Sequence, residues 1–346
     1  MSPAGRARRP WSRTGLSLVL LCLPLWAAAQ LAATTPLTTP ASRGVADRNW
    51  LERIQRAASS RSYQGTLMFS AAGVVSSSKV LHVCDGRDRV ERIEMLDGRA
   101  RLQYRHNDQL LTVWPGSKVA VVEPRDPVAE FPALPGAPGL DPLASYELRH
   151  MGAGRIAGHH AELLWLQPRD ALRFAHRLWA DRDTGLLLRS DVLGPQGEVL
   201  ESSSFTDLRI GGRLQAEPVL AAMKRLDGYR VVRPLSQKAH LDEEGWSLAH
   251  PVPGFQLVNC SKRTLEAAAT DGVPLQVLQS VFSDGMSHVS VFIEAFDPQR
   301  HKQPMRTSLG ATHTTMNRHG DWWLTIVGEV PMTTVLQFEA MLERRR

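Results

Sequence analysis

Histidine is the residue type best suited to metal binding, and it is densest at two places in this chain. His159 and His160 are adjacent at the turn into a strand-like run, while His313 and His319 flank a polar stretch typical of a loop. A zinc site usually takes three or four ligands, with thiols or carboxylates at defined spacing. Adjacent strand residues also point to opposite faces of a sheet. We therefore predict no metal site at either place.

Carboxylates gather in one short motif, Asp181-Arg182-Asp183-Thr184-Gly185, which has the look of a calcium loop. A calcium loop of twelve residues closes with a glutamate, but position 192 is valine. The motif also suits a tight turn between two strands, and a hairpin is the structure that we predict there.

Common catalytic motifs are missing from the sequence. It contains no Walker loop, no GxGxxG, no HExxH, no CxxC and no GxSxG nucleophile elbow. Carboxylates that are distant in sequence can still meet in a fold, but no spacing singles out a pair. We predict no catalytic residue and no cofactor, and hence a protein that is not an enzyme.

Apolar surface is what remains for ligand chemistry. Leu67 and Phe69 alternate with polar residues in one strand-like run, and Leu81 and Val83 lie in the next. At inward-facing positions of a curved sheet they would hold acyl chains, since each buried CH₂ contributes ~0.8 kcal/mol. We assign these four as candidate lipid-binding residues. The alternative is that a helix fills the concave face and they are ordinary core.

Lys262 and Arg263 form an adjacent basic pair in the second half of the chain. They are candidates for electrostatic contact with a protein partner, and the alternative is plain solvated surface.

The N-terminus has the features of a secretory signal peptide. Arginines up to Arg13 precede an apolar run of residues 15–25, too short to span a bilayer, and Ala27 to Ala29 end in a small-residue cleavage pattern. We predict cleavage after Ala29, with an uncleaved anchor as the alternative, and a disordered lead-in over residues 30–46. No later apolar run is long enough for a membrane span.

The net charge of +6 over 346 residues is a weak argument for nucleic acid. Four arginines of the leader supply most of it, so the mature chain is nearly balanced. The mature chain keeps Cys84 and Cys260. An oxidising compartment would permit a disulfide between them, but nothing in the sequence decides it.

Residues 47–212 predict one large antiparallel sheet behind a helix. Helical spacing from Asp47 changes to period two at Tyr63, and turn signals then separate short alternating runs. About ten strands are expected, and so long a sheet must curl. The expected runs are 63–70, 79–83, 89–96, 100–106, 110–114, 119–123, 146–151, 160–167, 174–180, 186–193 and 199–205. Six prolines between Pro124 and Pro142 predict a loop.

Residues 213–239 have helix formers at 219–226 and little strand pattern, which indicates a linker. A second unit follows at 240–346. Its expected strands are 255–259, 275–282, 289–295 and 322–327, with a closing helix at 332–342.

Ordered short motifs along residues 47–342 resemble the RseB/MucB family of periplasmic sigma-E regulators. No single motif is specific, but the set occurs in the right order with a linker in between. The motifs are YQGTL at 63–67, DG at 85–86, RIAG at 155–158, LQPRD at 166–170, RLW at 177–179, DTGL at 183–186, FTDL at 205–208, PGF at 253–255 and VGEVP at 327–331.

The resemblance implies an α+β fold: a LolA-like half-open barrel with helices, then a smaller α/β domain. It also implies a periplasmic negative regulator of the envelope-stress response. Such a protein binds the periplasmic segment of a membrane-anchored anti-sigma factor and shields it from regulated proteolysis, and lipid or lipopolysaccharide relieves the shielding. The alternative is a periplasmic carrier of lipids or lipoproteins, which would leave the second domain unexplained.

Overall fold

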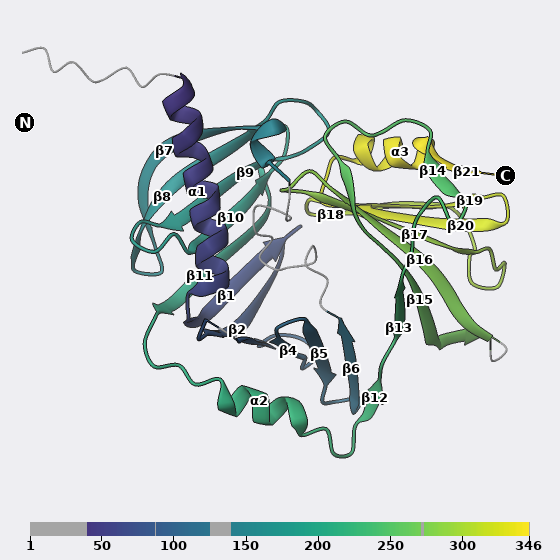
Figure 1. Ribbon diagram of the computed structural model, residues 1–346, viewed down its shortest axis with the longest axis horizontal. Coiled ribbons are helices and arrows are strands. Elements are labelled where there is room, and N and C mark those ends of the chain that lie inside the picture. The colour runs from purple at the N-terminus through teal and green to yellow at the C-terminus, as the bar shows by residue number, and fades with distance from the viewer. Residues whose placement is uncertain (1–39, 87, 125–139, 271–272, 346) are drawn as a thin grey trace, which may run out of the picture. The chain divides into compact units, whose positions relative to one another are not determined.

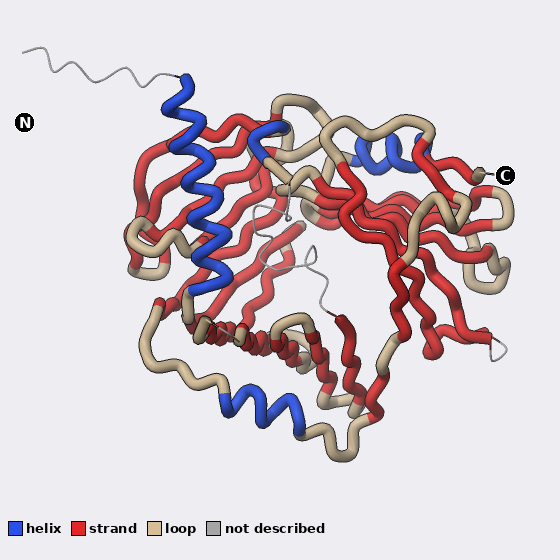
Figure 2. The backbone as a smooth tube through the Cα atoms, viewed as in Figure 1, coloured by secondary structure: helices blue, strands red, loops and turns tan. Residues whose placement is uncertain are grey.

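The structure is a computed structural model that describes residues 40–86, 88–124, 140–270 and 273–345. The predicted signal peptide, the first part of the lead-in and most of the proline-rich loop lie outside these residues. Strands make up most of the described chain, together with three α-helices (Figure 2). Residues Pro40–Arg346 form one compact unit. Within the described part, no helix is both long and apolar enough to cross a membrane.

Twelve strands form the large sheet (Figure 1). In chain order they are β1 (Tyr63–Ala71), β2 (Val74–Cys84), β3 (Arg89–Met95), β4 (Leu102–His106), β5 (Gln109–Trp114), β6 (Val119–Pro124), β7 (Tyr146–Ile156), β8 (His159–Pro168), β9 (Ala175–Asp181), β10 (Leu187–Leu193), β11 (Val199–Ile210) and β12 (Arg230–Val232). Their spatial order is β12-β6-β5-β4-β3-β2-β1-β11-β10-β9-β8-β7.

Period-two patterning and turn residues correctly predicted the first eleven of these strands. Consecutive strands pair as antiparallel hairpins from β1 to β6 and again from β7 to β11. The Asp181–Gly185 motif forms the predicted turn between β9 and β10, where the main chain of Gly185 has a φ of +82°. The sheet is open, because its edge strands β12 and β7 have no pairing with each other. The predicted large antiparallel sheet is confirmed for β1 to β11.

Helix α1 (Pro40–Ser60) covers one face of this sheet, which we call the inner face. Leu51, Ile54 and Ala57 recur at helical spacing and are buried in the two core clusters of that face. The predicted start at Asp47 is wrong by seven residues. Residues 40–46 are helical and not a disordered lead-in, and Pro40 suits a helix start because its missing N–H needs no partner there.

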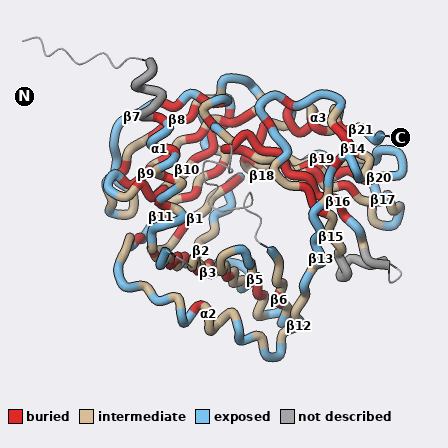
Figure 3. The backbone as a smooth tube through the Cα atoms, in the orientation of Figure 1, coloured by how far each residue is buried: buried red, intermediate tan, exposed pale blue. Residues whose placement is uncertain are grey.

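Helix α2 (Glu217–Lys224) covers part of the opposite face, which we call the outer face. Val219 is its buried residue and packs on Val90, Tyr104 and Leu111. Figure 3 shows that the rest of α2 is intermediate or exposed.

The segment predicted as a linker with little strand pattern is more structured than that. It carries α2 and then β12, which adds to β6 in parallel. It ends with β13 (Leu235–Lys238), which pairs with the second sheet. Strands of three or four residues are too short for alternation to reveal them.

The second sheet has seven strands in the order β13-β15-β16-β17-β20-β19-β18, all antiparallel where paired. A short pair of β14 (Trp246–Leu248) and β21 (Leu342–Arg344) flanks it. Its strands beyond β13 are β15 (Gln256–Thr270), β16 (Val273–Ser283), β17 (His288–Ala295), β18 (Met305–Leu309), β19 (Thr312–His319) and β20 (Trp322–Gly328). Helix α3 (Met332–Met341) packs on β19 and β20, and its Phe338 is fully buried among Phe255 and Phe282.

Besides β13, two strands of this sheet escaped prediction. The stretch between His313 and His319 is strand β19, not a loop. Strand β18 is exposed at every position, so no hydrophobic periodicity marks it.

Candidate ligand and partner surfaces

The four lipid candidates do not share one face of the large sheet. In the β1–β2 register Leu67 lies opposite Ser78, whereas Leu81 lies opposite Gln64. Because neighbouring strand residues alternate in direction, Leu67 and Phe69 belong to the inner face, and Leu81 and Val83 to the outer face. Our expectation of a single inward-facing set is therefore wrong.

On the inner face, Leu67 is 4% exposed and packs in a core that includes Ala57 of α1. Phe69 is partly buried two residues further along β1. The inner face is thus covered by a helix near Leu67, as the alternative to lipid binding supposed.

On the outer face, Leu81 lines a surface cavity of 560 Å³ formed by β11, β1, β2 and β3. Its other lining residues are mostly polar: Gln64, Gly65, Thr66, Lys79, Val80, Arg92, Glu94, Asp207 and Arg209. Arg92 and Glu94 form an ion pair there. Val83 is buried at 7% exposure beside this region.

The basic pair on β15 is engaged inside the molecule. Lys262 forms an ion pair with Glu244 at 2.8 Å, and Arg263 forms one with Glu123 of β6 at 2.9 Å. The second pair joins the two sheets. Both basic side chains are partly exposed, at 40% and 29%, so each keeps access to solvent.

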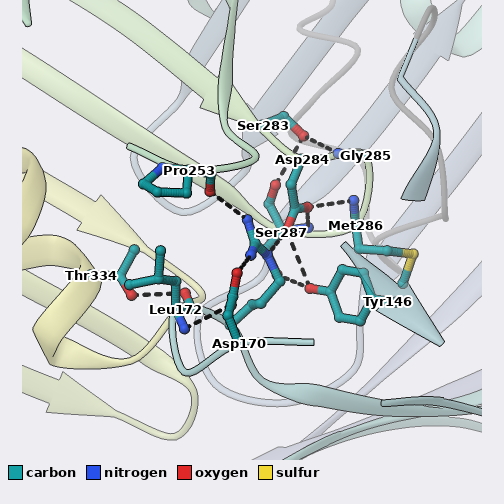
Figure 4. Close-up of polar contacts among 11 residues, drawn as sticks. Tyr146, Asp170, Leu172, Pro253, Ser283, Asp284, Gly285, Met286, Ser287 and Thr334 are labelled. Carbon is teal, nitrogen blue, oxygen red and sulfur yellow. Dashed lines mark hydrogen bonds and ion pairs between the residues drawn. The ribbon is translucent and has the colours of Figure 1, made fainter. Parts of the chain in front are cut away.

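A buried polar cluster joins the two sheets at the turn between β16 and β17 (Figure 4). Asp284 stands at the start of this turn with a fully buried side chain. One carboxylate oxygen accepts the main-chain N–H groups of Met286 and Ser287, at 2.8 and 2.7 Å. The acid therefore shapes its own turn.

The other oxygen of Asp284 reaches the large sheet. It accepts Nε of Arg173 at 2.6 Å and the hydroxyl of Tyr146 at 3.4 Å. Arg173 is itself buried and also donates to Asp170 and to the main-chain oxygen of Pro253. Its guanidinium lies 4.8 Å from the ring centre of Phe255. The cation is thus fully enclosed by acceptors and an aromatic face.

Burial shifts the ionisation of the groups around this pair. Burial and the Asp284 charge raise the pKa of Tyr146 well above its usual value, so its hydroxyl remains a donor. Burial lowers the pKa of His176 to about 4, so this histidine is neutral. Burial also opposes the charge on Arg173, but the carboxylates of Asp284 and Asp170 outweigh it and raise its pKa.

A further contact between the sheets is centred on Glu201 of β11. Its carboxylate accepts the main-chain N–H of Ala311, in the turn between β18 and β19, at 2.9 Å. It also shares a side-chain hydrogen bond with Glu329. Burial, and then the charge of Glu201, raise the pKa of Glu329 to about 8, so Glu329 is mostly protonated at neutral pH.

The structure describes the histidines and cysteines that the sequence singles out. Among the described residues no three metal-ligating side chains converge. His159 faces Asp181 at 3.4 Å, and His313 bonds to the main-chain oxygen of Val330 at 2.8 Å. Cys84 and Cys260 are both free thiols.

Sequence reasoning missed the contacts between the sheets at Asp284 and at Glu201. Arg173 and Asp284 are 111 positions apart, and Asp284-Gly285 carries only an ordinary turn signal. Glu329 lies inside one of the motifs quoted above, but its partner Glu201 stands in the predicted strand 199–205, where nothing in the sequence marks it as a contact residue.

The fold is a large open sheet joined by polar contacts to a smaller sheet. Comparison with known families assigns the chain to a class of regulatory proteins. Residues 46–223 match the MucB/RseB N-terminal domain and residues 240–343 match the MucB/RseB C-terminal domain. The chain belongs to the MucB/RseB family of sigma-factor regulatory proteins, which are not enzymes.

Curated relatives extend over most of the chain. The sigma factor AlgU regulatory protein MucB of Pseudomonas aeruginosa is 30% identical, over 86% of this chain and 91% of the relative. The sigma-E factor regulatory protein RseB of Haemophilus influenzae is 23% identical, over 94% and 95%. A crystal structure of MucB in complex with MucA(peri) matches with a TM-score of 0.63 and 26% identity, over 87% of this chain and 99% of that one.

Proposed function

We propose that this chain is a periplasmic negative regulator of a sigma-E-type envelope-stress response. It binds the periplasmic segment of a membrane-anchored anti-sigma factor and shields that segment from regulated proteolysis. The observation that carries the proposal is the match, over 87% of the chain, to MucB solved with MucA(peri). A shield needs surface and affinity and no nucleophile, which agrees with a family of regulatory proteins.

The basic pair on β15 is our candidate for partner contact. Lys262 and Arg263 lie at partly exposed ion pairs, whose carboxylates a partner can replace. Lys262→Glu and Arg263→Glu should weaken binding of the anti-sigma segment and its dependence on salt. Lys302→Glu is the matched control, because Lys302 is an exposed lysine in the same half of the chain. It donates a long hydrogen bond of 3.4 Å to the main-chain oxygen of Pro298.

Lipid or lipopolysaccharide is proposed to relieve the shielding by binding the inner face. Phe69→Asp and Leu81→Asp are matched probes, since both residues are partly buried and they lie on opposite faces. Loss of lipid binding in the first variant only would support the inner face. Loss in the second only would move the site to the outer cavity.

The test of the whole proposal is reconstituted proteolysis. The anti-sigma segment is incubated with its protease, with and without the purified protein, and lipopolysaccharide is then added. Protection that lipopolysaccharide relieves supports both parts. Protection that lipopolysaccharide does not relieve would support the shielding function and refute the lipid signal. Lipid binding without protection would favour a carrier.

Export to the periplasm is tested separately. Mass spectrometry of the mature protein should find Gln30 at its N-terminus, and a retained segment 16–25 would contradict cleavage.

A further inference from the structure

The β16–β17 turn inserts a side chain of the second sheet into the core of the first. Met286 is 7% exposed and packs in the inner-face cluster with Leu51 and Ile54 of α1 and with Tyr146. Figure 4 shows Met286 and Tyr146 on the same side of the turn. The inner face is therefore filled from two directions, by α1 and by a residue of the other sheet.

The insertion is reciprocal. Leu172, which precedes β9 of the large sheet, packs against the core of the second sheet. Its main-chain oxygen accepts the hydroxyl of Thr334 from α3 at 2.7 Å. Between the two insertions lies the buried Arg173–Asp284 ion pair. Because Met286 and Asp284 belong to one turn, a movement of the turn that withdraws Met286 would also strain this ion pair.

Two buried polar groups of the inner face are unsatisfied among the described residues. Nε2 of His176 and Oγ of Ser203 are buried, and neither has a hydrogen-bond partner among the described residues. Both side chains share the inner face, since His176 lies opposite Val192 and Ser203 lies opposite Phe69 in the strand register. Buried polar groups normally find partners, so these two favour a ligand with both apolar and hydrogen-bonding parts.

We propose that the β16–β17 turn is an internal plug: Met286 occupies the inner face in place of an acyl chain, and an acyl chain that enters releases the contact between the two sheets. The proposal rests on the lipid part of the proposed function and supplies its coupling device. An acyl chain buries more apolar surface than one thioether side chain. Because the ligand needs the state from which Met286 has withdrawn, binding shifts the population toward it.

The experiment uses the full chain and cis-parinaric acid as the fluorescent probe. Met286→Ala removes the competitor, so the probe should bind about fivefold more tightly. Met305→Ala is the matched control, because Met305 is 48% exposed on edge strand β18. Its affinity should equal that of the wild type.

Hydrogen exchange of the wild type gives a readout that does not depend on a variant's folding. The amides of Met286 and Ser287 are bonded to Asp284 in the closed state. Saturating probe should speed their exchange at least about tenfold. The amide of Asp297, bonded to His301 in another turn of the same sheet, should not change.

Two outcomes overturn the plug. In the first, the probe binds, but hydrogen exchange at residues 286–287 is unchanged and Met286→Ala has the same affinity as the wild type. This result would refute the plug and leave the proposed lipid signal standing. No binding of probe to either protein removes the plug and the lipid signal together. The shield itself is judged by the proteolysis assay, so its failure is distinguishable from both.

Discussion

Substitutions at the buried Arg173–Asp284 pair should destabilise the protein in a particular order. Asp284 accepts four hydrogen bonds, from Arg173, Tyr146 and the amides of Met286 and Ser287. Arg173→Met removes one of the four and leaves the carboxylate with three donors. Asp284→Ala removes all four and leaves a buried guanidinium without its main counter-charge.

The expected magnitudes follow from those bonds. Breaking a buried ion pair from one side costs ~3–5 kcal/mol. Arg173→Met should lie near ~3 kcal/mol, because Asp284 keeps three donors. Asp284→Ala should lie near ~5 kcal/mol, since two turn amides also lose an acceptor at ~1 kcal/mol each. The double variant should cost less than the sum of the two, because the orphaned charge is gone.

Urea unfolding followed by tryptophan fluorescence and circular dichroism measures these free energies. Arg48→Met is the control, since the Arg48–Asp141 pair has side chains that are 61% and 45% exposed and should be worth less than ~1 kcal/mol. If Arg173→Met costs as much as Asp284→Ala, the turn amides contribute nothing measurable. If both cost less than ~1 kcal/mol, the pair does not hold the sheets together.

Three further predictions concern the other contacts. Because burial beside Glu201 raises the folded-state pKa of Glu329 from 4.5 to about 8, the folded state binds this proton more tightly than the unfolded state. Stability should therefore fall as pH rises from 5 toward about 8, by no more than ~1.4 kcal/mol per pH unit, and Glu329→Gln should flatten the curve in thermal melts. Reversing the charge of Arg263 should lower stability by up to ~1 kcal/mol, and adding Glu123→Arg should restore it in a double-mutant cycle. Trypsin should cut first within residues 213–239, as expected for two domains, and the fragments should co-elute in gel filtration because Met286 and Leu172 still join them; early separation would contradict the reciprocal insertion.

The large sheet could be predicted from the sequence because its strands are half buried. In β8, for example, Leu164 and Leu166 are buried while Trp165 between them is more exposed, and this contrast is what alternation records. Strand β18 has no buried residue and β12 has only three residues, so neither leaves such a trace.

The faces of the lipid candidates could not be derived from alternation alone. Period two says that Leu67 and Phe69 share a face, but the relation between β1 and β2 depends on the hairpin register. Here Val80 and not Leu81 lies opposite Gly65, which places Leu81 on the outer face. A shift of the hairpin register by one residue would therefore move a candidate side chain to the other face of the sheet.

The contact between the two sheets must be stable without lipid and must separate when lipid binds. A buried ion pair flanked by apolar insertions meets both requirements. The pair fixes how the sheets meet, yet its net contribution is small, because water rehydrates Arg173 and Asp284 when they separate. The apolar contact of Met286 has no such compensation in water, and only another apolar group can replace it. An acyl chain is such a group, so lipid should open the contact. Salt should not, since screening acts weakly on a pair whose side chains are 1% and 0% exposed. Exchange at Met286 and Ser287 that rises with lipid but not with 0.5 M salt would therefore separate apolar competition from electrostatic loosening.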